Sequence, residues 1–318
     1  MLSKLLNKST SIVQATRGEF REILGSTLVL TNPRARLGRG IRQGRLFSGL
    51  GELLWYLSGS NSLDFISYYI PKYRDESSDG VTIKGSYGER IFRSEQIHRI
   101  LALLKNRKTS RRAVLQIFMP EDLQNPKEVP CTISLQFFSR NNMLDLIVSM
   151  RSNDALIGLP HDIFSFTMIQ EIAARHLGLE LGKYIHFVGS LHLYSQQVKD
   201  AEDYIADGLQ RRVAMPAMPI GDPFPRIQAL VDAERHIRET GKTPGSTKNM
   251  ENYWADFVTL LRAYHYIRKK DSKGLHRMKE RLTTDHYHQY IEMRARKIME
   301  NRAPDPLSIQ NLLELSPE

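Results

Sequence analysis

The chain has 318 residues, a formal net charge of +10, a hydrophobic fraction of 41% and a single cysteine. This is enough apolar material for one large domain or two. One thiol excludes an internal disulfide and fits a reducing compartment. No apolar run approaches the roughly 20 residues of a membrane span, and the first 20 residues are too polar for a secretory signal. The composition therefore predicts a cytoplasmic protein without a membrane segment.

The positive charge indicates anionic partners. Lys and Arg are spread along the whole sequence, without a basic tail or a DNA-binding motif. This distribution favours phosphorylated small molecules over nucleic acid.

The N-terminal residues predict a helix or helix-turn over 3 to 24 and a short strand over 26 to 30. Five Arg and three Gly follow between Asn32 and Leu46. Such a segment is typical of a loop that holds an anion, with Arg34 or Arg36 as the candidate ligand. The alternative is a solvated surface loop.

Ser48 predicts the start of a helix that continues to Leu57 and stops at Gly59. Glu52 lies on this helix among leucines and Trp55. A buried acid is costly unless it is partnered or protonated, so Glu52 is a candidate functional group. The alternative is an acid at the edge of the core that reaches solvent.

A helix at about 94 to 105 is followed by Arg111 and Arg112 and by an apolar strand over 113 to 119. Cys131 then begins a strand in which apolar and polar residues alternate. A lone Cys is most often a small buried hydrophobe, but it can also be a nucleophile. A second strand, 144 to 154, delivers Arg151, Ser152 and Asp154; the planar Arg fork suits a phosphate.

A Gly158-Leu159-Pro160 turn precedes a predicted helix from Ile163 to Leu177. Asp162 directly before it is a good N-cap on pattern alone. His192 would by itself be an ordinary strand histidine. Beyond residue 225 the sequence predicts helices, including a basic one at about 276 to 301. His286 and His288 lack companions at metal-ligand spacing, so no metal site is predicted.

Five segments carry a resemblance to a known family. They are GELLWYLSG at 51 to 59, SRRAVLQIF at 110 to 118, VPCTISLQFF at 129 to 138, RSNDALIGLPHDIF at 151 to 164 and GKYIHFVGSLHLY at 182 to 194. In order and spacing the chain resembles thymidylate synthase and the pyrimidine-nucleotide hydroxymethylases, from about residue 20 to about 220. The resemblance implies an α/β (α+β) three-layer fold with a large mixed sheet at a dimer interface. It places the catalytic domain over 1–225 and a mostly helical extension, packed on it, over 226–318.

The resemblance also implies roles for individual residues. The residues implied to be catalytic are Cys131, Glu52, Tyr87 and Asp154. Asp154 and Gly158 would meet the co-substrate 5,10-methylenetetrahydrofolate. Arg111 and Arg112 would reach the phosphate site of the neighbouring subunit in a homodimer. The residues expected to bind the nucleotide are Arg34, Arg36, Arg111, Arg112, Gln136, Arg151, Ser152, Asp162, His192 and Tyr194.

Asp162 stands where thymidylate synthases have an Asn that reads uracil, and the family's cytidylate hydroxymethylases have Asp there. The chain also lacks the tryptophans and the closing C-terminal tail that help to hold the folate. These departures predict hydroxymethylation of dCMP or CMP through a Cys131 adduct. The alternatives are methylation of dUMP to dTMP, and a non-catalytic derivative that binds nucleotides or nucleic acid.

Overall fold

The computed structural model describes residues 1–7, 10–15, 18–40, 45–125 and 127–300. The chain forms two compact units, Met1–Val231 and Asp232–Glu318, and the division falls within helix α8 (Phe224–Thr240). Each unit is described by itself.

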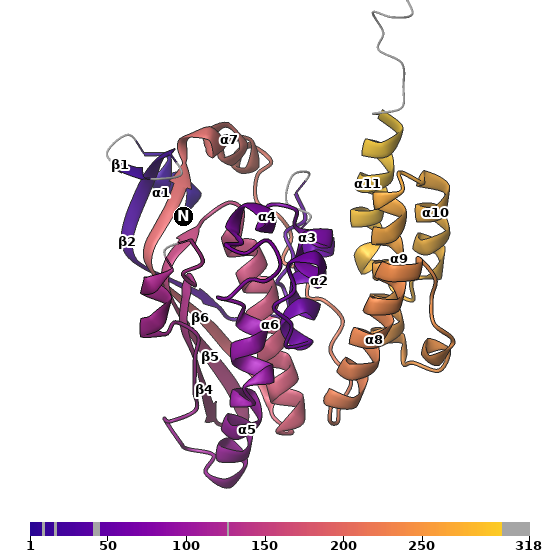
Figure 1. Cartoon of the computed structure of the whole chain (residues 1–318), viewed down its shortest axis with the longest axis horizontal. Coiled ribbons are helices and arrows are strands. Elements are labelled where there is room, and N and C mark those ends of the chain that lie inside the picture. The colour runs from indigo at the N-terminus through magenta and orange to yellow at the C-terminus, as the bar shows by residue number, and fades with distance from the viewer. Residues whose placement is uncertain (8–9, 16–17, 41–44, 126, 301–318) are drawn as a thin grey trace, which may run out of the picture. The chain divides into compact units, whose positions relative to one another are not determined.

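The first unit is built on a six-stranded mixed sheet, in the order β1-β2-β6-β5-β4-β3 (Figure 1). β5 and β6 are parallel, whereas every other neighbouring pair is antiparallel. This sheet confirms the predicted mixed α/β class. The strands are β1 (Ser11–Ala15), β2 (Gly18–Leu30), β3 (Val114–Gln116), β4 (Thr132–Arg140), β5 (Met143–Asp154) and β6 (Glu180–Tyr194).

Helix α6 (Gly158–His176) joins β5 to β6 and packs against β5, β6 and α2 (Leu46–Leu57). Its apolar residues are almost all buried, as are those of α2, so both helices belong to the core that covers one face of the sheet (Figure 1). The remaining helices of this unit are α1 (Leu2–Leu5), α3 (Leu63–Tyr69), α4 (Tyr73–Glu76), α5 (Gln96–Asn106) and α7 (Val198–Ala206), with α8 beginning before the division.

The opposite face of the sheet carries apolar side chains that the described part of the chain leaves exposed. Val29 and Phe187 are 55% and 40% exposed. They lie on β2 and β6, which pair with each other directly. An antiparallel sheet can face water on one side, but that side is then ordinarily polar.

Two predictions about the strands of the first unit were wrong. Residues 11–15 and 18–30 form strands, not a helix, because β2 pairs with β6 along almost its whole length. In β4 a register shift between Thr132 and Ser134 interrupts the expected alternation, so Thr132 is fully buried and Ile133 only partly. Long-range pairing decided the first outcome and a bulge the second.

The second unit is helical, as predicted. It contains α9 (Asn252–Arg268), α10 (Ser272–Arg281) and α11 (His288–Glu300) around buried Trp254, Phe257 and Tyr290. The single basic helix expected over 276–301 is broken into two. Thr283 lies at the break, where its backbone N–H and its hydroxyl both donate to Asp256 at 2.8 Å. These hydrogen bonds replace the helical ones that the break removes.

Candidate active site

Cys131 lies immediately before β4 and is half-buried. The neighbouring strand β5 brings Arg151 beside it, and the Arg151 backbone N–H donates to the Cys131 carbonyl at 2.8 Å. The guanidinium of Arg151 donates from Nε to Pro130 and from Nη2 to Val129, each at 2.9 Å. The Arg151 side chain therefore holds the segment that carries the thiol.

Tyr87 contacts the start of β4. Its hydroxyl accepts a hydrogen bond from the Thr132 backbone N–H at 3.1 Å, and its ring stacks on Tyr56 at 5.3 Å. A Cβ at Gly88 would lie 2.6 Å from the Tyr56 carbonyl oxygen, so glycine permits this approach to α2. Burial, followed by the charges of Cys131 and Asp162, raises the pKa of Tyr87, which keeps its hydroxyl protonated.

Glu52 is buried on α2, with 6% of its surface exposed. Its Oε1 accepts a hydrogen bond of 2.6 Å from the hydroxyl of Tyr73, at the start of α4. The structure thus resolves the open question about Glu52: the acid does not reach freely into solvent but has a buried polar partner.

Asp162 is not an N-cap. Helix α6 begins at Gly158, four residues earlier, so the predicted Gly-Leu-Pro turn is already helical and Asp162 lies in the second turn. Its Oδ2 accepts a hydrogen bond of 2.7 Å from the side-chain amide of Asn153, on β5. Burial, followed by the negative charge of Glu52, raises the pKa of Asp162 well above its usual value, although the Asn153 hydrogen bond opposes this. Half-buried Asp162 and buried Glu52 therefore lie close enough for their charges to interact.

Asp154 and Gly158, the two residues that the resemblance implies for folate binding, lie near Asp162. Asp154 ends β5, where its Oδ1 accepts from the backbone N–H groups of Leu156 and Ile157 and its Oδ2 from Gln197, all at 2.8 Å. A Cβ at Gly158 would come within 3.2 Å of the Asn153 amide and 3.9 Å of the Asp162 carboxyl. The absence of a Cβ at Gly158 therefore leaves room for the Asn153 amide beside Asp162.

His192 and Tyr194 lie near the end of β6, where His192 pairs in register with Asp154. The Ser152 hydroxyl is 3.3 Å from His192 Nδ1. The imidazole contacts the Tyr194 ring edge-on at 5.0 Å and the Phe20 ring at 5.2 Å. The structure brings three of the predicted residues together here and adds Phe20, from the misassigned N-terminal strand.

The two candidate arginines of the N-terminal loop have internal partners. Arg36 is buried and forms an ion pair with Glu171 of α6 at 2.5 Å. Glu171 also accepts from the Met218 backbone N–H, while Arg34 donates to the Met215 carbonyl at 3.2 Å. These contacts hold the loop against the segment after α7. The predicted role of either arginine in phosphate binding stays a prediction.

Arg111 and Arg112 precede β3 and are both exposed. The side-chain amide of Gln136, on β4, donates to the Arg111 carbonyl at 2.9 Å. The backbone at Arg111 is thus fixed while the two guanidinium groups extend from the surface, as a contribution to a neighbouring subunit would require.

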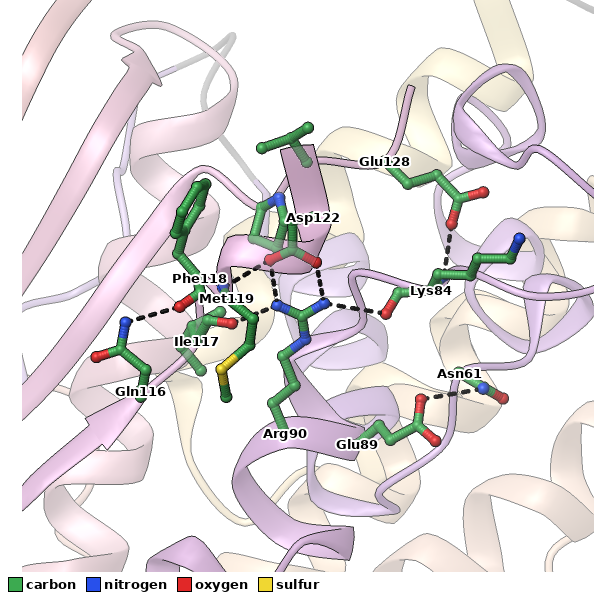
Figure 2. Close-up of polar contacts among 12 residues, drawn as sticks. Asn61, Lys84, Glu89, Arg90, Gln116, Ile117, Phe118, Met119, Asp122 and Glu128 are labelled. Carbon is green, nitrogen blue, oxygen red and sulfur yellow. Dashed lines mark hydrogen bonds and ion pairs between the residues drawn. The ribbon is translucent and has the colours of Figure 1, made fainter. Parts of the chain in front are cut away.

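A second arginine organises the residues that precede Cys131 (Figure 2). The guanidinium of Arg90 makes two hydrogen bonds to the Asp122 carboxylate, at 2.6 and 2.5 Å, and also donates to the carbonyls of Ile117 and Lys84. Buried Glu128 accepts from the Lys84 backbone N–H at 2.5 Å. Such forked Arg–carboxylate contacts fix geometry as well as charge, so they anchor the chain on its way to the thiol.

Several residues of this region were not predicted from the sequence. Tyr73 contacts Glu52 and Asn153 contacts Asp162, and buried His161 contacts Ile157 and the Ser48 hydroxyl. His186 has its Nδ1 2.7 Å from the Tyr184 hydroxyl, and burial lowers its pKa to about 4, so it is neutral. Asn153 lies between two predicted residues in RSND, whereas nothing in the sequence around Tyr73 indicated its partner.

Within the described residues, no group of three or more His, Cys, Asp or Glu side chains is arranged to hold a metal ion. No helix in the same part of the chain combines the length and apolar composition that a membrane span needs.

The site joins a half-buried thiol, an adjacent arginine, one buried and one half-buried acid and a half-buried tyrosine on a mixed β-sheet. That set is typical of an enzyme that attacks an electrophilic ring through sulfur. Residues 41–233 match the family model described as thymidylate synthase. Because this match covers more than half of the chain, the protein belongs to the thymidylate synthase family.

Members of this family are one-carbon transferases that act on pyrimidine nucleotides and use methylenetetrahydrofolate. The chain is 32% identical over 162 residues to the deoxyuridylate hydroxymethyltransferase of Pseudomonas phage M6, which is 49% of this chain and 46% of that protein. It is 30% identical over 216 residues to the deoxyuridylate hydroxymethyltransferase of Delftia phage PhiW-14, 61% of this chain and 59% of that protein. A thymidylate synthase of Listeria monocytogenes is 31% identical over 123 residues, 39% of this chain and 38% of that enzyme. The chain thus spans less than two thirds of each relative.

Proposed function

We propose that this protein attaches a one-carbon unit to C5 of a pyrimidine nucleoside monophosphate and completes it as a hydroxymethyl group, with (d)CMP as the preferred nucleotide. The observation that carries this proposal is Asp162, a half-buried acid anchored by Asn153 in the second turn of α6. An acid in this place differs from the amide by which thymidylate synthases read uracil.

Cys131 begins the reaction by adding its thiolate to C6 of the base, which makes C5 nucleophilic. Arg151 supports this step because a guanidinium beside a thiol favours the thiolate. Two of its nitrogens hold the Cys131 segment, while Nη1 makes no hydrogen bond to the described residues. That nitrogen is positioned to bind the 5′-phosphate. Tyr87 assists the loss of the C5 proton.

The folate co-substrate supplies the one-carbon unit as a methylene group, and Asp154 and Gly158 would hold it. A methyl product needs a hydride delivered between two rings in a near-attack geometry. Tryptophans that clamp the folate in the family are missing between Trp55 and Trp254. The residue beside Glu52 is a tyrosine whose hydroxyl contacts the acid. The polar Tyr73–Glu52 pair favours addition of water to the methylene over transfer of a hydride to it.

The neutral form of Asp162 supports the choice of cytosine. Its raised pKa gives the side chain a proton to donate as well as an oxygen to accept. Cytosine presents an acceptor at N3 and a donor at its exocyclic amine, so a neutral acid satisfies both. An unmet buried polar group costs about 1–3 kcal/mol, on the order of a tenfold to hundredfold preference.

The proposal is tested by incubating the full chain with labelled methylenetetrahydrofolate and, separately, dCMP, CMP and dUMP. We expect tetrahydrofolate and a 5-hydroxymethyl nucleotide, formed fastest from a cytidine monophosphate. Dihydrofolate together with thymidylate from dUMP would reject hydroxymethylation in favour of a synthase. Binding of nucleotide or DNA without turnover of any nucleotide would instead support a non-catalytic derivative.

A second candidate is hydroxymethylation of dUMP. Two relatives at 30% identity or more are named for that nucleotide. A neutral carboxyl can also pair with uracil, if its proton faces O4 and its bare oxygen faces N3–H. Faster formation of hydroxymethyl product from dUMP than from dCMP in the same assay would select this candidate.

We also propose that the enzyme is a homodimer, as is typical of the family. The sheet face that carries Val29 and Phe187 supplies an exposed apolar surface of the kind that marks an interface. Arg111 and Arg112 would then complete the partner's phosphate site. Sedimentation equilibrium should give twice the monomer mass, and Phe187→Lys should shift the protein toward monomer; a monomeric, fully active wild type would reject this assembly.

A further inference from the structure

One hydrogen bond in the site that the sequence did not indicate joins Tyr73 to Glu52. The hydroxyl donates to Oε1 over 2.6 Å, between residues 21 positions apart. Burial, followed by the charge of Glu52 and this hydrogen bond, raises the pKa of Tyr73. The Tyr73 hydroxyl therefore stays protonated and acts as a donor, while Oε2 of Glu52 makes no hydrogen bond to any residue that the structure describes.

The ring of Tyr73 packs against the indole of Trp55. Trp55 meets the Tyr73 ring edge-on at 5.4 Å and lies three residues after Glu52 on α2, so the two side chains share one side of the helix. The indole Nε1 of Trp55 is buried and has no hydrogen-bond partner among the described residues. A buried donor of this kind is commonly satisfied by an ordered water.

From this geometry we infer that Tyr73 is a positioning residue that orients Glu52 toward the water that completes the hydroxymethyl group. The inference rests on the proposed function and deepens it. Tyr73 occupies one carboxylate oxygen of Glu52, so the other is fixed in direction. A base held in this way is more effective than one free to rotate.

The step is balanced without any oxidant or reductant. Before it, Cys131 has bonded to C6, and C5 has bonded to the one-carbon unit of the folate and lost its proton. The bond from that carbon to the folate nitrogen then breaks, its electrons leave on tetrahydrofolate, and C5 carries an exocyclic methylene. The water oxygen bonds to that carbon as Glu52 accepts a water proton, and the C5-methylene electron pair moves toward C4. The pair then returns to form the C5–C6 double bond, while the bond from C6 to sulfur breaks and its electrons leave on Cys131 as thiolate. Glu52 finally releases its proton to solvent.

The test compares Tyr73→Phe with the wild type in two assays. Release of tritium from C5 of the labelled nucleotide reports the steps up to proton loss. Formation of hydroxymethyl nucleotide reports the water step. Tyr73→Phe keeps the ring on Trp55 and removes only the donor, so we expect tritium release within about threefold of wild type and a fall in product of about tenfold to a hundredfold. The pH profile of product formation should shift as well.

Two further variants separate positioning from folding. Tyr253→Phe removes a hydroxyl from another buried tyrosine, in α9, and should leave both assays unchanged. In a Glu52→Gln background, Tyr73→Phe should have no additional effect, because it acts through the carboxylate. Equal losses in both assays, an unchanged product-to-tritium ratio, or additive effects with Glu52→Gln would overturn the inference. A wild type that makes thymidylate instead would reject the proposed function, and with it the water step.

Discussion

The amide of Asn153 donates to Asp162 Oδ2 over 2.7 Å, and this joins the end of β5 to the second turn of α6. A carboxyl oxygen that accepts a hydrogen bond is the poorer site for a proton. In the protonated form, which its raised pKa favours, Asp162 would therefore carry the proton on Oδ1. Under the proposed function, the base would be recognised by the edge that meets Oδ1, and Asn153 would set which oxygen carries the proton.

The first prediction concerns these two residues. Asp162→Asn should shift the ratio of kcat/KM for dUMP over that for dCMP upward by about tenfold to a hundredfold, because an amide satisfies uracil. Asn153→Ala should bring the same ratio closer to one, because the proton is no longer directed. Steady-state kinetics on both nucleotides measures both effects, and an unaltered ratio in both variants would assign the pair a purely structural role.

The second prediction concerns the only thiol. Cys131→Ser should reduce turnover at least about a thousandfold, because the serine hydroxyl is a much weaker nucleophile at neutral pH. Nucleotide binding, measured by calorimetry, should persist because the Arg151 contacts run to backbone carbonyls. A variant that retains turnover would exclude covalent catalysis by sulfur.

The third prediction concerns the Arg36–Glu171 ion pair, whose side chains are 0% and 1% exposed. Glu171→Gln leaves a buried cation without its counter-charge and should cost about 3–5 kcal/mol of unfolding free energy. Glu180→Gln is the matched control, because Glu180 pairs with Arg175 at 70% exposure and should cost less than about 1 kcal/mol. Urea unfolding measures both. Similar small losses in the two variants would show that Arg36 does not depend on Glu171.

The fourth prediction is a pH dependence. Burial acts to raise the pKa of Asp122, but hydrogen bonds from Arg90 and from the Met119 backbone outweigh it and hold this pKa below its usual value. A lowered folded-state pKa gives stability that is complete above the unfolded value, about 3.9, and is lost as pH falls toward the folded value. Asp122→Asn should cost about 2 kcal/mol at pH 7 and progressively less below pH 4. Thermal melts across this range should converge; a constant difference would contradict the assignment.

Much of the fold followed from local patterns. The end of α2 at Leu57, the helix after residue 94 and the strand before Asp154 all agree with the structure because apolar periodicity and glycine stops are local signals. The N-terminal strands were missed because pairing with β6, far along the chain, outweighs local propensity. The break after α10 was missed because Asp256 stabilises it from another helix.

The candidate site was predictable to a similar degree. Cys131, Arg151 and Asp162 lie in the segments that carry the family resemblance. The structure places Arg151 directly against the Cys131 segment. Tyr73 was not predictable, because a hydroxyl that reaches Glu52 across 21 residues leaves no local pattern. The start of α6 could not be decided either, since Asp162 satisfies the N-cap rule as well as it suits a buried acid.

The pairing of β2 with β6 connects the two ends of the first unit, from Phe20 opposite Tyr194 to Leu30 opposite Tyr184. During synthesis on the ribosome, β2 emerges early and can pair with the short β1, but its other edge has no strand to join until β6 has been made. Until then, the edge of β2 that pairs with β6 could form hydrogen bonds with other strands or other chains. We therefore expect chaperones to bind nascent β2 and misfolding to begin in this region.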